Sequence, residues 1–308
     1  MNNLIVSVSP HYHSKNSTTR IMLDVIIALI PALIASCLIF GMRSLMVVAI
    51  SVAACVAFEY AWCKLMKKEV TTGDLSAVVT GMLLAYNAPA TMPVWQILVG
   101  AFIAIVIVKM LFGGIGCNFV NPALVGRVAM TLSFTASMTN YNSHVAAVDV
   151  LSSATPLAVM DQLQMSDFMT LFLGQHGGVL GETCALALLL GGVYLCVRGI
   201  IKPTIPVTFI GSTLVFTWLF GGANPVLSVF SGGLMLGAIF MATDYVTSPI
   251  TCKGRVIFGI GCGFLAAAIR VFANSTEGVS FAILLMNLLV PYINGWSKTK
   301  PVGGAVTK

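Results

Sequence analysis

Long apolar stretches separated by short polar ones dominate the chain, and they recur from Ile21 almost to its end. Most are roughly 20 residues long, the length that a helix needs to cross about 30 Å of hydrocarbon. They are apolar throughout rather than alternating over about 10 residues, which excludes a transmembrane β-barrel. The pattern predicts an all-α polytopic membrane protein with about ten transmembrane helices. The predicted ranges are 21–40, 44–64, 75–87, 93–112, 119–134, 180–198, 203–220, 224–242, 254–272 and 276–294.

The order of these helices predicts an internal symmetry. The third and fifth are short, and we expect half-helices or broken helices buried against the others. Five helices in each half indicate two inverted five-helix repeats, an arrangement common in transporters. A faint similarity between FVNPALVGR (119–127) and YVTSPITCKGR (245–255) agrees with this. The expected divisions are an N-terminal segment 1–20, a first repeat 21–134, a loop 135–179, a second repeat 180–294 and a tail 295–308.

Basic residues gather on one side of this ten-helix arrangement. If both termini lie in the cytoplasm, 14 of the 16 Lys and Arg residues fall on the cytoplasmic side, and only Arg43 and Arg270 fall outside. Positive charge collects in cytoplasmic loops, and one missing or extra span would reverse every later loop. The interval 135–179 contains no Lys or Arg and is therefore placed outside. These observations predict a multi-pass protein of the cell inner membrane with cytoplasmic termini.

Composition narrows the classes further. The chain is 58% hydrophobic and 8% charged, whereas a soluble domain has about 25% charged residues. The basic residues of the cytoplasmic loops account for the net charge of +6. We therefore expect contact with membrane lipid and no nucleic-acid partner. The eight cysteines form no CxxC pair, which argues against a disulfide framework or an iron–sulfur cluster held by this chain alone. Cys117 is expected to have a packing role, with contact to a partner's ligands as the alternative.

A hydroxyl-rich stretch, DVLSSATPL (149–157), lies in the predicted outer loop. Pro156 disfavours helix at the residue before it, so Thr155 is expected on an extended and exposed segment. Such a hydroxyl can serve as the attachment point of a modifying group. An ordinary Ser/Thr turn followed by a helix that starts at Pro156 explains the same residues. The residues alone leave both interpretations open.

A glycine-rich stretch, LFGGIGCNFVNPALVGR (111–127), forms the second polar feature. Its three closely spaced glycines allow a non-helical path at membrane depth, and Asn118 and Asn121 can hydrogen-bond freed backbone groups or a polar ring system. Pro122 suits the start of a short helix whose N-terminus favours anionic groups. The stretch is either a helix break needed for packing or one wall of a buried ligand cavity, because irregular backbone in a membrane normally lines such a cavity.

Acidic residues within the predicted spans are the third feature. A carboxylate in lipid is costly, and it marks a functional site by default. Asp244 lies beside three hydroxyl residues in MATDYVTSP and offers the hard oxygen ligands that a small cation prefers. Asp24 and Glu59 have an alternative role, since each could pair with Arg or Lys at a neighbouring helix end. Asp74 begins the third predicted helix.

Four stretches occur together and in order: SPHYHSKNSTTRIMLDVIIALIPAL, FGGIGCNFVNPALVGR, DVLSSATPL and MATDYVTSP. With them the chain resembles, over nearly its whole length, the D subunits of Rnf complexes, the ion-translocating ferredoxin:NAD oxidoreductases of bacteria. It is also similar to the B subunits of sodium-translocating NADH:quinone reductases. The beginning of the chain resembles the Rnf members, because the quinone-reductase subunits carry a longer N-terminal extension.

The resemblance implies a covalent cofactor in the outer loop. In this family the motif D-x-x-(S/T)-(G/S)-A-T receives FMN through a phosphoester to the threonine hydroxyl, and a flavin transferase attaches it from the outer side. The matching residues here are Asp149, Ser152, Ser153, Ala154 and Thr155. Ser153 stands where the family usually has Gly, and serine is small enough for a tight turn.

The resemblance also implies a place in an electron relay. Electrons from reduced ferredoxin would cross to flavins on the G and D subunits and return to reduce NAD, with the A, B, C, E and G subunits as partners. A second, noncovalent flavin (riboflavin) would lie deeper in the chain, with the loop 113–127, including Asn118, Asn121 and Arg127, as a candidate wall. Asp244 and Asp24 are candidates for the cation path, which would carry Na⁺ or H⁺.

Two other functions remain open from the residues alone. Inverted repeats with half-helices also fit a small-solute channel or carrier without flavin. A passive membrane anchor for other redox subunits is the third possibility, in which Thr155 would be dispensable for electron transfer. The four histidines show no metal-ligand spacing, and no nucleophile–base pair supports hydrolytic chemistry.

Overall fold

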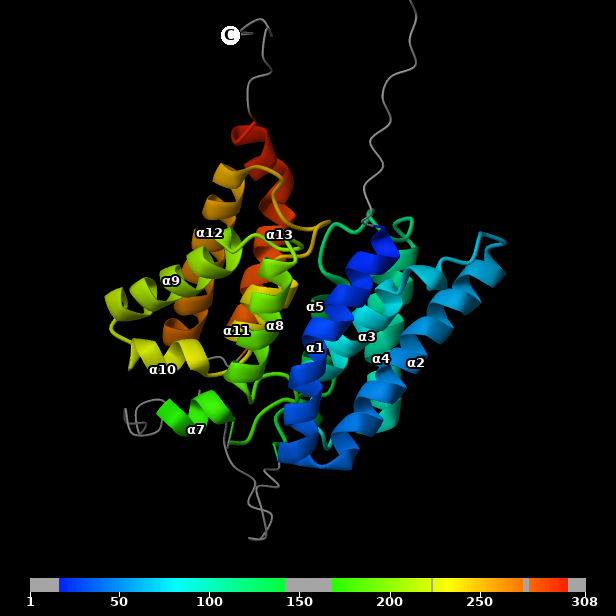
Figure 1. The fold of residues 1–308 in the computed structure, drawn as a ribbon, viewed down its shortest axis with the longest axis horizontal. Coiled ribbons are helices and arrows are strands. Elements are labelled where there is room, and N and C mark those ends of the chain that lie inside the picture. Colours follow the sequence, from blue (N-terminus) through cyan, green and yellow to red (C-terminus); the bar gives the residue numbers. More distant parts are fainter. Residues whose placement is uncertain (1–16, 142–167, 175, 223, 274–276, 299–308) are drawn as a thin grey trace, which may run out of the picture.

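A computed structural model of the chain describes residues 17–141, 168–174, 176–222, 224–273 and 277–298. Within these residues the fold is built from helices and connecting turns, without a strand (Figure 1). Ten membrane segments follow one another along the described chain, and each overlaps one of the ten predicted ranges. The prediction of an all-α polytopic membrane protein is confirmed.

The first five segments are α1, α2, α3, α4 with its continuation η2, and α5. Their bounds are Thr18–Phe40, Met42–Leu65, Ser76–Tyr86, Val94–Phe102, Ile103–Met110 and Pro122–Ser133. A short 3₁₀ turn, η1 (Thr72–Asp74), precedes α3. The third and fifth segments are short, as predicted. The fourth changes from α-helix to π-helix at Ile103, a transition that is frequent at functional sites and that the apolar pattern did not indicate.

The second five segments are α8, α9, the broken eighth segment α10–α11–η5, α12 and α13. Their bounds are Ala185–Val197, Thr204–Leu219, Pro225–Phe230, Leu234–Leu236, Gly237–Met241, Cys252–Phe272 and Gly278–Trp296. The eighth segment was predicted as one continuous helix over 224–242, and this was wrong. It breaks between Phe230 and Leu234, where Gly232 adopts a φ of +65° that a residue with a side chain rarely takes.

Side chains and prolines fix where the segments begin. The Ser17 hydroxyl caps α1 by accepting from Arg20 N, and the Thr251 hydroxyl caps α12 by accepting from Gly254 N. Asn121 caps α5, and Pro122 occupies its first position, where the missing N–H costs nothing. Gly41, with a φ of +78°, lets the chain reverse between α1 and α2 within a single residue.

Part of the helix packing is similar in the two halves. In the first half α2 lies against α4–η2, which lies against α5; in the second half α9 lies against α12, which lies against α13. The halves meet where α1 runs beside α8 (Figure 1). The similar stretches 119–127 and 245–255 precede the fifth and the ninth segments, so they do not fall at equivalent positions of the two halves.

Small residues make the contact between α1 and α8 possible. Gly191 of α8 faces α1 so closely that a Cβ there would collide with the Ala28 carbonyl oxygen. Close backbone approach of this kind is how helices associate in lipid, because burying apolar side chains gains little there. The large apolar side chains that α1, α8 and α9 leave exposed, such as Leu38, Val197 and Val207, are consistent with a lipid-facing surface.

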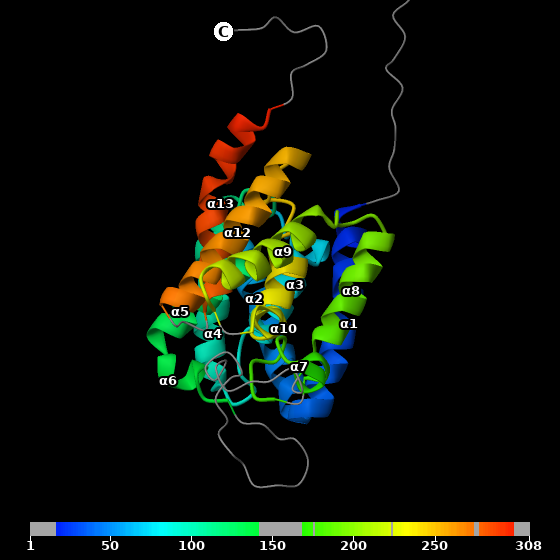
Figure 2. The ribbon, with the colours of Figure 1, turned by 90° about the vertical axis from the view of Figure 1, so that its left-hand side faces the viewer.

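The ends of the segments fall at two faces. α1 begins and α13 ends at one face, at the top of Figures 1 and 2, and we call it the terminal face. The short helices α6 (Thr135–Met138) and α7 (Phe168–Leu173), which flank residues 142–167, lie at the opposite face (Figure 2). Four helices, α1, α2, α12 and α13, are long and apolar enough to cross a membrane on their own. The shorter segments cross only as parts of the bundle.

The predicted loop 135–179 contains the two short helices α6 and α7 in its described part. Within its described part, α7 packs on α10 through a cluster of Phe168, Phe172 and Phe230, whose ring centroids are 5.1 to 5.9 Å apart. Phe230 meets the other two rings edge to face, and aromatic rings in this arrangement attract one another beyond their burial. This contact fixes the chain at the point where it leaves residues 142–167.

Candidate functional site

A cavity opens between the two halves near the terminal face. It contains about 810 Å³ of empty space, counting the part open to the surface. Its walls come from α1, α3, η2, the loop before α5, the end of α8 and the chain after η5. Most of the lining is apolar. The polar lining residues are Ser76, Thr80, Lys109, Asn118, Asn121, Thr243, Asp244 and Tyr245.

Asn118 and Asn121 enter the cavity wall with different bonding. The side-chain oxygen of Asn121 accepts from the N–H groups of Ala123 and Leu124, and its nitrogen donates to Met241 O at 3.3 Å. The side-chain oxygen of Asn118 is buried and has no hydrogen-bond partner among the described residues. A buried acceptor without a donor is costly. Asn118 therefore offers an acceptor to an N–H or O–H group of a ligand, whereas Asn121 holds the wall together.

Asp244 stands opposite, in the turn between η5 and α12. Its carboxylate accepts from the Thr247 hydroxyl at 3.2 Å, and the N–H groups of Val246 and Tyr245 also bond to it. Burial raises the pKa of this carboxyl, and the three donors only partly oppose the rise. The charged form is therefore expensive, which favours uptake of a proton or a cation. The hydroxyl of Thr243 donates to Ile239 O and is not directed to the carboxylate.

A buried ion pair forms the wall behind Ser76. Lys109 Nζ lies 2.6 Å from Glu59 Oε2 and 2.7 Å from Ser76 Oγ, and both charged side chains are almost wholly buried. Glu59 also accepts from the Thr71 hydroxyl at 2.6 Å, and Ser76 donates to Asp74. The pairing considered for Glu59 is thus present. It places a lysine ammonium at the cavity, on the π-helical stretch η2.

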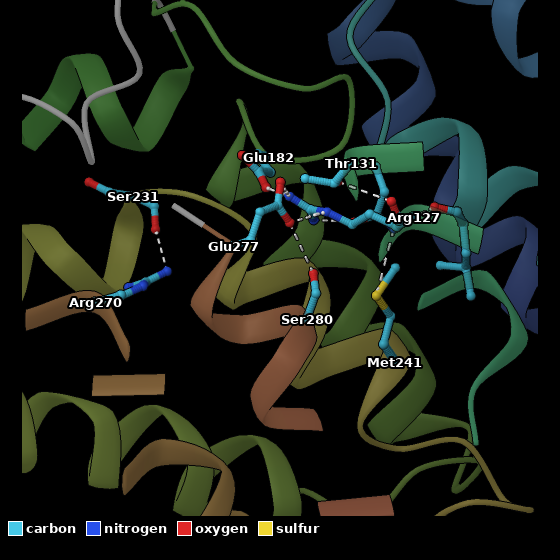
Figure 3. Close-up of polar contacts among 10 residues, drawn as sticks. Arg127, Thr131, Glu182, Ser231, Met241, Arg270, Glu277 and Ser280 are labelled. Atoms are coloured by element: carbon cyan, nitrogen blue, oxygen red, sulfur yellow. Dashed lines mark hydrogen bonds and ion pairs between the residues drawn. The ribbon is translucent and has the colours of Figure 1, made fainter. Parts of the chain in front are cut away.

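Arg127 does not line the cavity. It lies deeper, between Glu182 before α8 and Glu277 before α13, as Figure 3 shows. Its Nη2 is 3.1 Å from Glu182 Oε1, its Nε is 2.8 Å from Glu277 Oε2, and its Nη1 donates to Asn87 at the end of α3. The cluster therefore joins the end of one half-helix to the starts of two other segments. Two carboxyl groups thus surround one guanidinium.

Arg270 of α12 closes the break in the eighth segment. Its guanidinium donates to Ser228 O at 2.7 Å. It also donates to Ser231 O at 3.1 Å, the contact drawn in Figure 3. The last carbonyls of a helix have no partner within it, and a cation at that end also suits the helix dipole. The order of the predicted helices placed Arg270 on the outer side, as an exception to the charge bias, and the structure buries it against α10.

Asp24 is held by an ion pair and is not among the cavity residues. Arg198 Nη2 lies 3.1 Å from Asp24 Oδ2, and the Tyr194 hydroxyl donates to Asp24 Oδ1 at 2.9 Å. This is the alternative that the sequence allowed, in which the acid pairs with a basic residue at a helix end. The pair ties α1 to the end of α8. A role of Asp24 in the cation path stays a prediction.

Comparison with known proteins decides the family. The sequence pattern of the NQR2, RnfD, RnfE family matches residues 5–303, almost the whole chain. The chain belongs to this family. It is 46% identical over 311 residues to the D subunit of the Na⁺-translocating ferredoxin:NAD⁺ oxidoreductase complex of Acetobacterium woodii, with 99% of this chain and 96% of that protein covered. The resemblance seen in the four sequence stretches is confirmed.

Two further relatives name different ions. The chain is 39% identical to the D subunit of the proton-translocating ferredoxin:NAD⁺ oxidoreductase complex of Clostridium ljungdahlii, over 96% of this chain and 95% of that protein. It is 34% identical to the D subunit of the ion-translocating oxidoreductase complex of Actinobacillus succinogenes, over 96% of both. The names of these relatives therefore differ in the ion that each complex translocates.

The sequence-predicted residues divide into three groups on this family fold. Asn118, Asn121 and Asp244 come together at the cavity, and Arg127 and Asp24 lie in separate ion-paired clusters. The residues of the attachment motif, Asp149, Ser152, Ser153, Ala154 and Thr155, lie outside the described residues. Cys117 is exposed, which contradicts the packing role expected for it. No group of three or more His, Cys, Asp or Glu side chains that could hold a metal ion occurs in the described part.

Glu182, Glu277 and Lys109 were missed as parts of buried clusters. The two glutamates fall within the predicted helices 180–198 and 276–294, so the rule applied to Asp24 and Glu59 would also have found them. Lys109 was counted only as a cytoplasmic charge, because it stands near the end of its apolar run. Its partner Glu59 is 50 residues away, and only the packing of α2 against η2 brings the two together.

Proposed function

We propose that this chain is the D-type membrane subunit of an ion-translocating ferredoxin:NAD⁺ oxidoreductase complex and that it carries flavin as an electron relay. The observation that carries the proposal is the 46% identity over 99% of the chain to the D subunit of such a complex. The A, B, C, E and G subunits are the proposed partners, and Na⁺ or H⁺ is the proposed ion. The chain would act only within the assembled complex.

FMN joined to Thr155 is the first proposed relay group. The stretch 149–155 matches the family's attachment motif, and a flavin transferase would form the phosphoester. The described helices on either side of the stretch, α6 and α7, lie at the face opposite to the start of α1 and the end of α13 (Figure 2). This agrees with attachment on the outer side if both termini are cytoplasmic. A covalent tether keeps a cofactor in place at a water-exposed surface.

The cavity near the terminal face is the proposed site of a second, noncovalent flavin. Its mostly apolar walls suit a planar ring system, and the unpartnered Asn118 oxygen suits a ring N–H group. The Lys109 ammonium would favour negative charge on a group bound beside it. Flavin supplies the electron chemistry when bound, while the residues of the cavity set its position and electrostatics.

The cation path is proposed to pass Asp244. This carboxylate lines the same cavity, so a change of charge on a redox group there would alter its affinity for a cation. Such a differential interaction is what coupling requires, because a ligand shifts an equilibrium only by its difference in affinity for two states. Asp24, near the beginning of α1, is the second candidate.

Intact-protein mass spectrometry of the chain from its native complex tests the covalent flavin. We expect a mass increase equal to FMN minus water, mapped to residues 135–179, and a fluorescent band that survives denaturation. Thr155→Ala should abolish both, whereas the neighbouring Ser152→Ala should retain them. An unmodified Thr155 in the active complex would contradict the proposal.

The same variants separate the alternatives. A solute carrier predicts no covalent flavin and substrate uptake by the isolated chain. A passive anchor predicts that electron transfer from reduced ferredoxin to NAD⁺ survives in Thr155→Ala. We expect this transfer to fall to background in Thr155→Ala and to continue in Ser152→Ala.

A further inference from the structure

A second pocket opens at the terminal face beside the cavity. It holds about 600 Å³ of empty space, counting the part open to the surface, between the end of α8 and the beginnings of α9 and α12. Its lining includes Gly199, Lys202, Ser248 and Arg255. We propose that this pocket, which we call the basic pocket, binds a phosphate group, and that an anionic phospholipid of the adjoining leaflet supplies it.

The charge of the basic pocket has one sign. Lys202 and Arg255 both line it, and no Asp or Glu does. Among the described residues, no carboxylate lies within ion-pair distance of either cation. By contrast Arg198, close by in sequence, is neutralised by Asp24. Two cations that share a pocket repel one another, so an anion between them stabilises the arrangement.

Residues 1–16 and 299–308 contain neither Asp nor Glu. A bound anion would neutralise both cations of the pocket. Anionic lipid is available to every membrane protein at this depth.

Hydrogen-bond donors in the basic pocket suit a phosphate. Arg255 Nε donates to Pro249 O at 3.1 Å, which fixes the guanidinium and leaves its two terminal nitrogens for a ligand. A guanidinium presents paired donors that match two phosphate oxygens. The Ser248 hydroxyl adds a further donor, and α9 and α12 begin beside the pocket, so that the positive ends of two helix dipoles face the same region.

The position favours a lipid over a soluble phosphate. The pocket lies where membrane helices end, at the depth of the headgroups. Ile250, 78% exposed, and Val197, 81% exposed, flank these helix ends and offer contact to acyl chains. Basic pockets between helices at this depth bind anionic headgroups in other membrane proteins. A soluble anion would use the charges but not the exposed apolar rim.

A thiol placed in the pocket gives a local readout. Ser248→Cys introduces it with little change of size, and Cys117, which is exposed on another loop, serves as the internal control. The purified, lipid-depleted complex would be treated with N-ethylmaleimide in detergent containing phosphatidylglycerol, phosphatidylcholine or inorganic phosphate at matched ionic strength. Peptide mass spectrometry then gives the alkylation rate of both thiols.

We expect phosphatidylglycerol to slow alkylation at position 248 by at least about fivefold, with phosphatidylcholine ineffective and Cys117 unchanged, because two cations favour the anionic headgroup. Adding Lys202→Gln and Arg255→Gln should abolish this protection. The matched pair Lys64→Gln and Lys67→Gln, which removes two exposed charges at the end of α2, should retain it.

The outcomes distinguish a lipid headgroup from free phosphate as the ligand, and they also show whether the site exists. If inorganic phosphate without lipid protects position 248 as well as phosphatidylglycerol does, the phosphate site stands but its assignment to lipid is overturned. Equal rates in phosphatidylglycerol and phosphatidylcholine, without protection by phosphate, would overturn the site. If the Lys64→Gln and Lys67→Gln pair loses protection as fully as the Lys202→Gln and Arg255→Gln pair, the effect comes from general surface charge. That result would also overturn the proposed site. None of these results depends on the flavins.

Discussion

Arg127 and Glu277 form a buried ion pair across 150 residues of sequence, with Arg127 Nε 2.8 Å from Glu277 Oε2. The contact ties the fifth segment to the start of the tenth, and Glu182 and Asn87 extend it to the sixth and third. The third, fifth, sixth and tenth segments thus meet at one buried polar cluster. Unfolding any one of them would remove at least one of these buried polar contacts.

Removal of this guanidinium should be far more damaging than removal of one carboxylate. Arg127→Met removes the guanidinium that lies between two buried carboxylates and should lower the free energy of unfolding by about 3–5 kcal/mol. Glu277→Gln keeps a hydrogen-bonding group and leaves Arg127 paired with Glu182, so we expect a loss of only about 1 kcal/mol. Denaturation of the purified chain in mixed micelles measures both.

Arg43→Met is the control for the loss of an arginine. Arg43 is exposed and donates only to Thr91 O, so its loss should change stability by less than about 0.5 kcal/mol. Equal losses for Arg127→Met and Glu277→Gln would show that the cluster does not act as described.

The Lys109–Glu59 pair should show strong coupling in a double-mutant cycle. Lys109→Met and Glu59→Gln should each destabilise the protein by several kcal/mol, because each leaves a buried partner unsatisfied. The double variant should lose at least about 1 kcal/mol less than the sum of the single losses. Lys64→Met, at the exposed end of the same helix as Glu59, is the control, and strict additivity would count against the pair.

Asn118 and Asn121 should separate ligand binding from stability. Asn118→Ala removes an oxygen that has no partner in the described structure, so the melting temperature should stay the same. Noncovalent flavin retained by the purified complex should fall about tenfold, the equivalent of one hydrogen bond of about 1.4 kcal/mol. Unchanged flavin content in a folded Asn118→Ala complex would argue against the cavity as its site.

Asn121→Ala is expected to behave in the opposite way. It removes the cap of α5 and the contact to Met241 O, which should cost at least about 1 kcal/mol of stability. Flavin release after acid denaturation and thermal unfolding of the same samples give both quantities.

Gly191 should tolerate no side chain. Gly191→Ala would bring a methyl group into the Ala28 carbonyl and push α8 from α1, which should cost about 1–3 kcal/mol. Gly211→Ala in α9 is the matched control, since a Cβ there meets nothing within 4 Å and alanine favours the helix. Destabilisation by both variants to the same extent would mean that helix propensity rather than the α1–α8 contact decides the effect.

The helices show which features the sequence predicts and which need the structure. The apolar runs predicted all ten segments, and the third and fifth were recognised as short, because hydrocarbon thickness sets the length of a spanning helix. The break in α10–α11–η5 escaped, although Ser231, Gly232 and Gly233 stand at it, because small residues within an apolar run also occur in unbroken membrane helices. The π-helical turn at Lys109 has no signature in the pattern.

Within the site, residue type fixed the candidates and packing fixed their roles. Apolar surroundings alone marked Asp24, Glu59 and Asp244 as costly charges. Which of them is paired depends on groups far away in sequence: Arg198 for Asp24 and Lys109 for Glu59. Asp244 is bonded by its own turn and faces the cavity.

By itself, then, the sequence determined the membrane class, the number of segments and the family, because these follow from local hydrophobicity and from stretches that are contiguous in the chain. Tertiary structure alone decided that Asn118, Asn121 and Asp244 share one cavity, while Arg127 lies with Glu182 and Glu277 in another centre. Pairing of buried charges is a long-range property, since its free energy depends on distance and burial and not on separation along the chain.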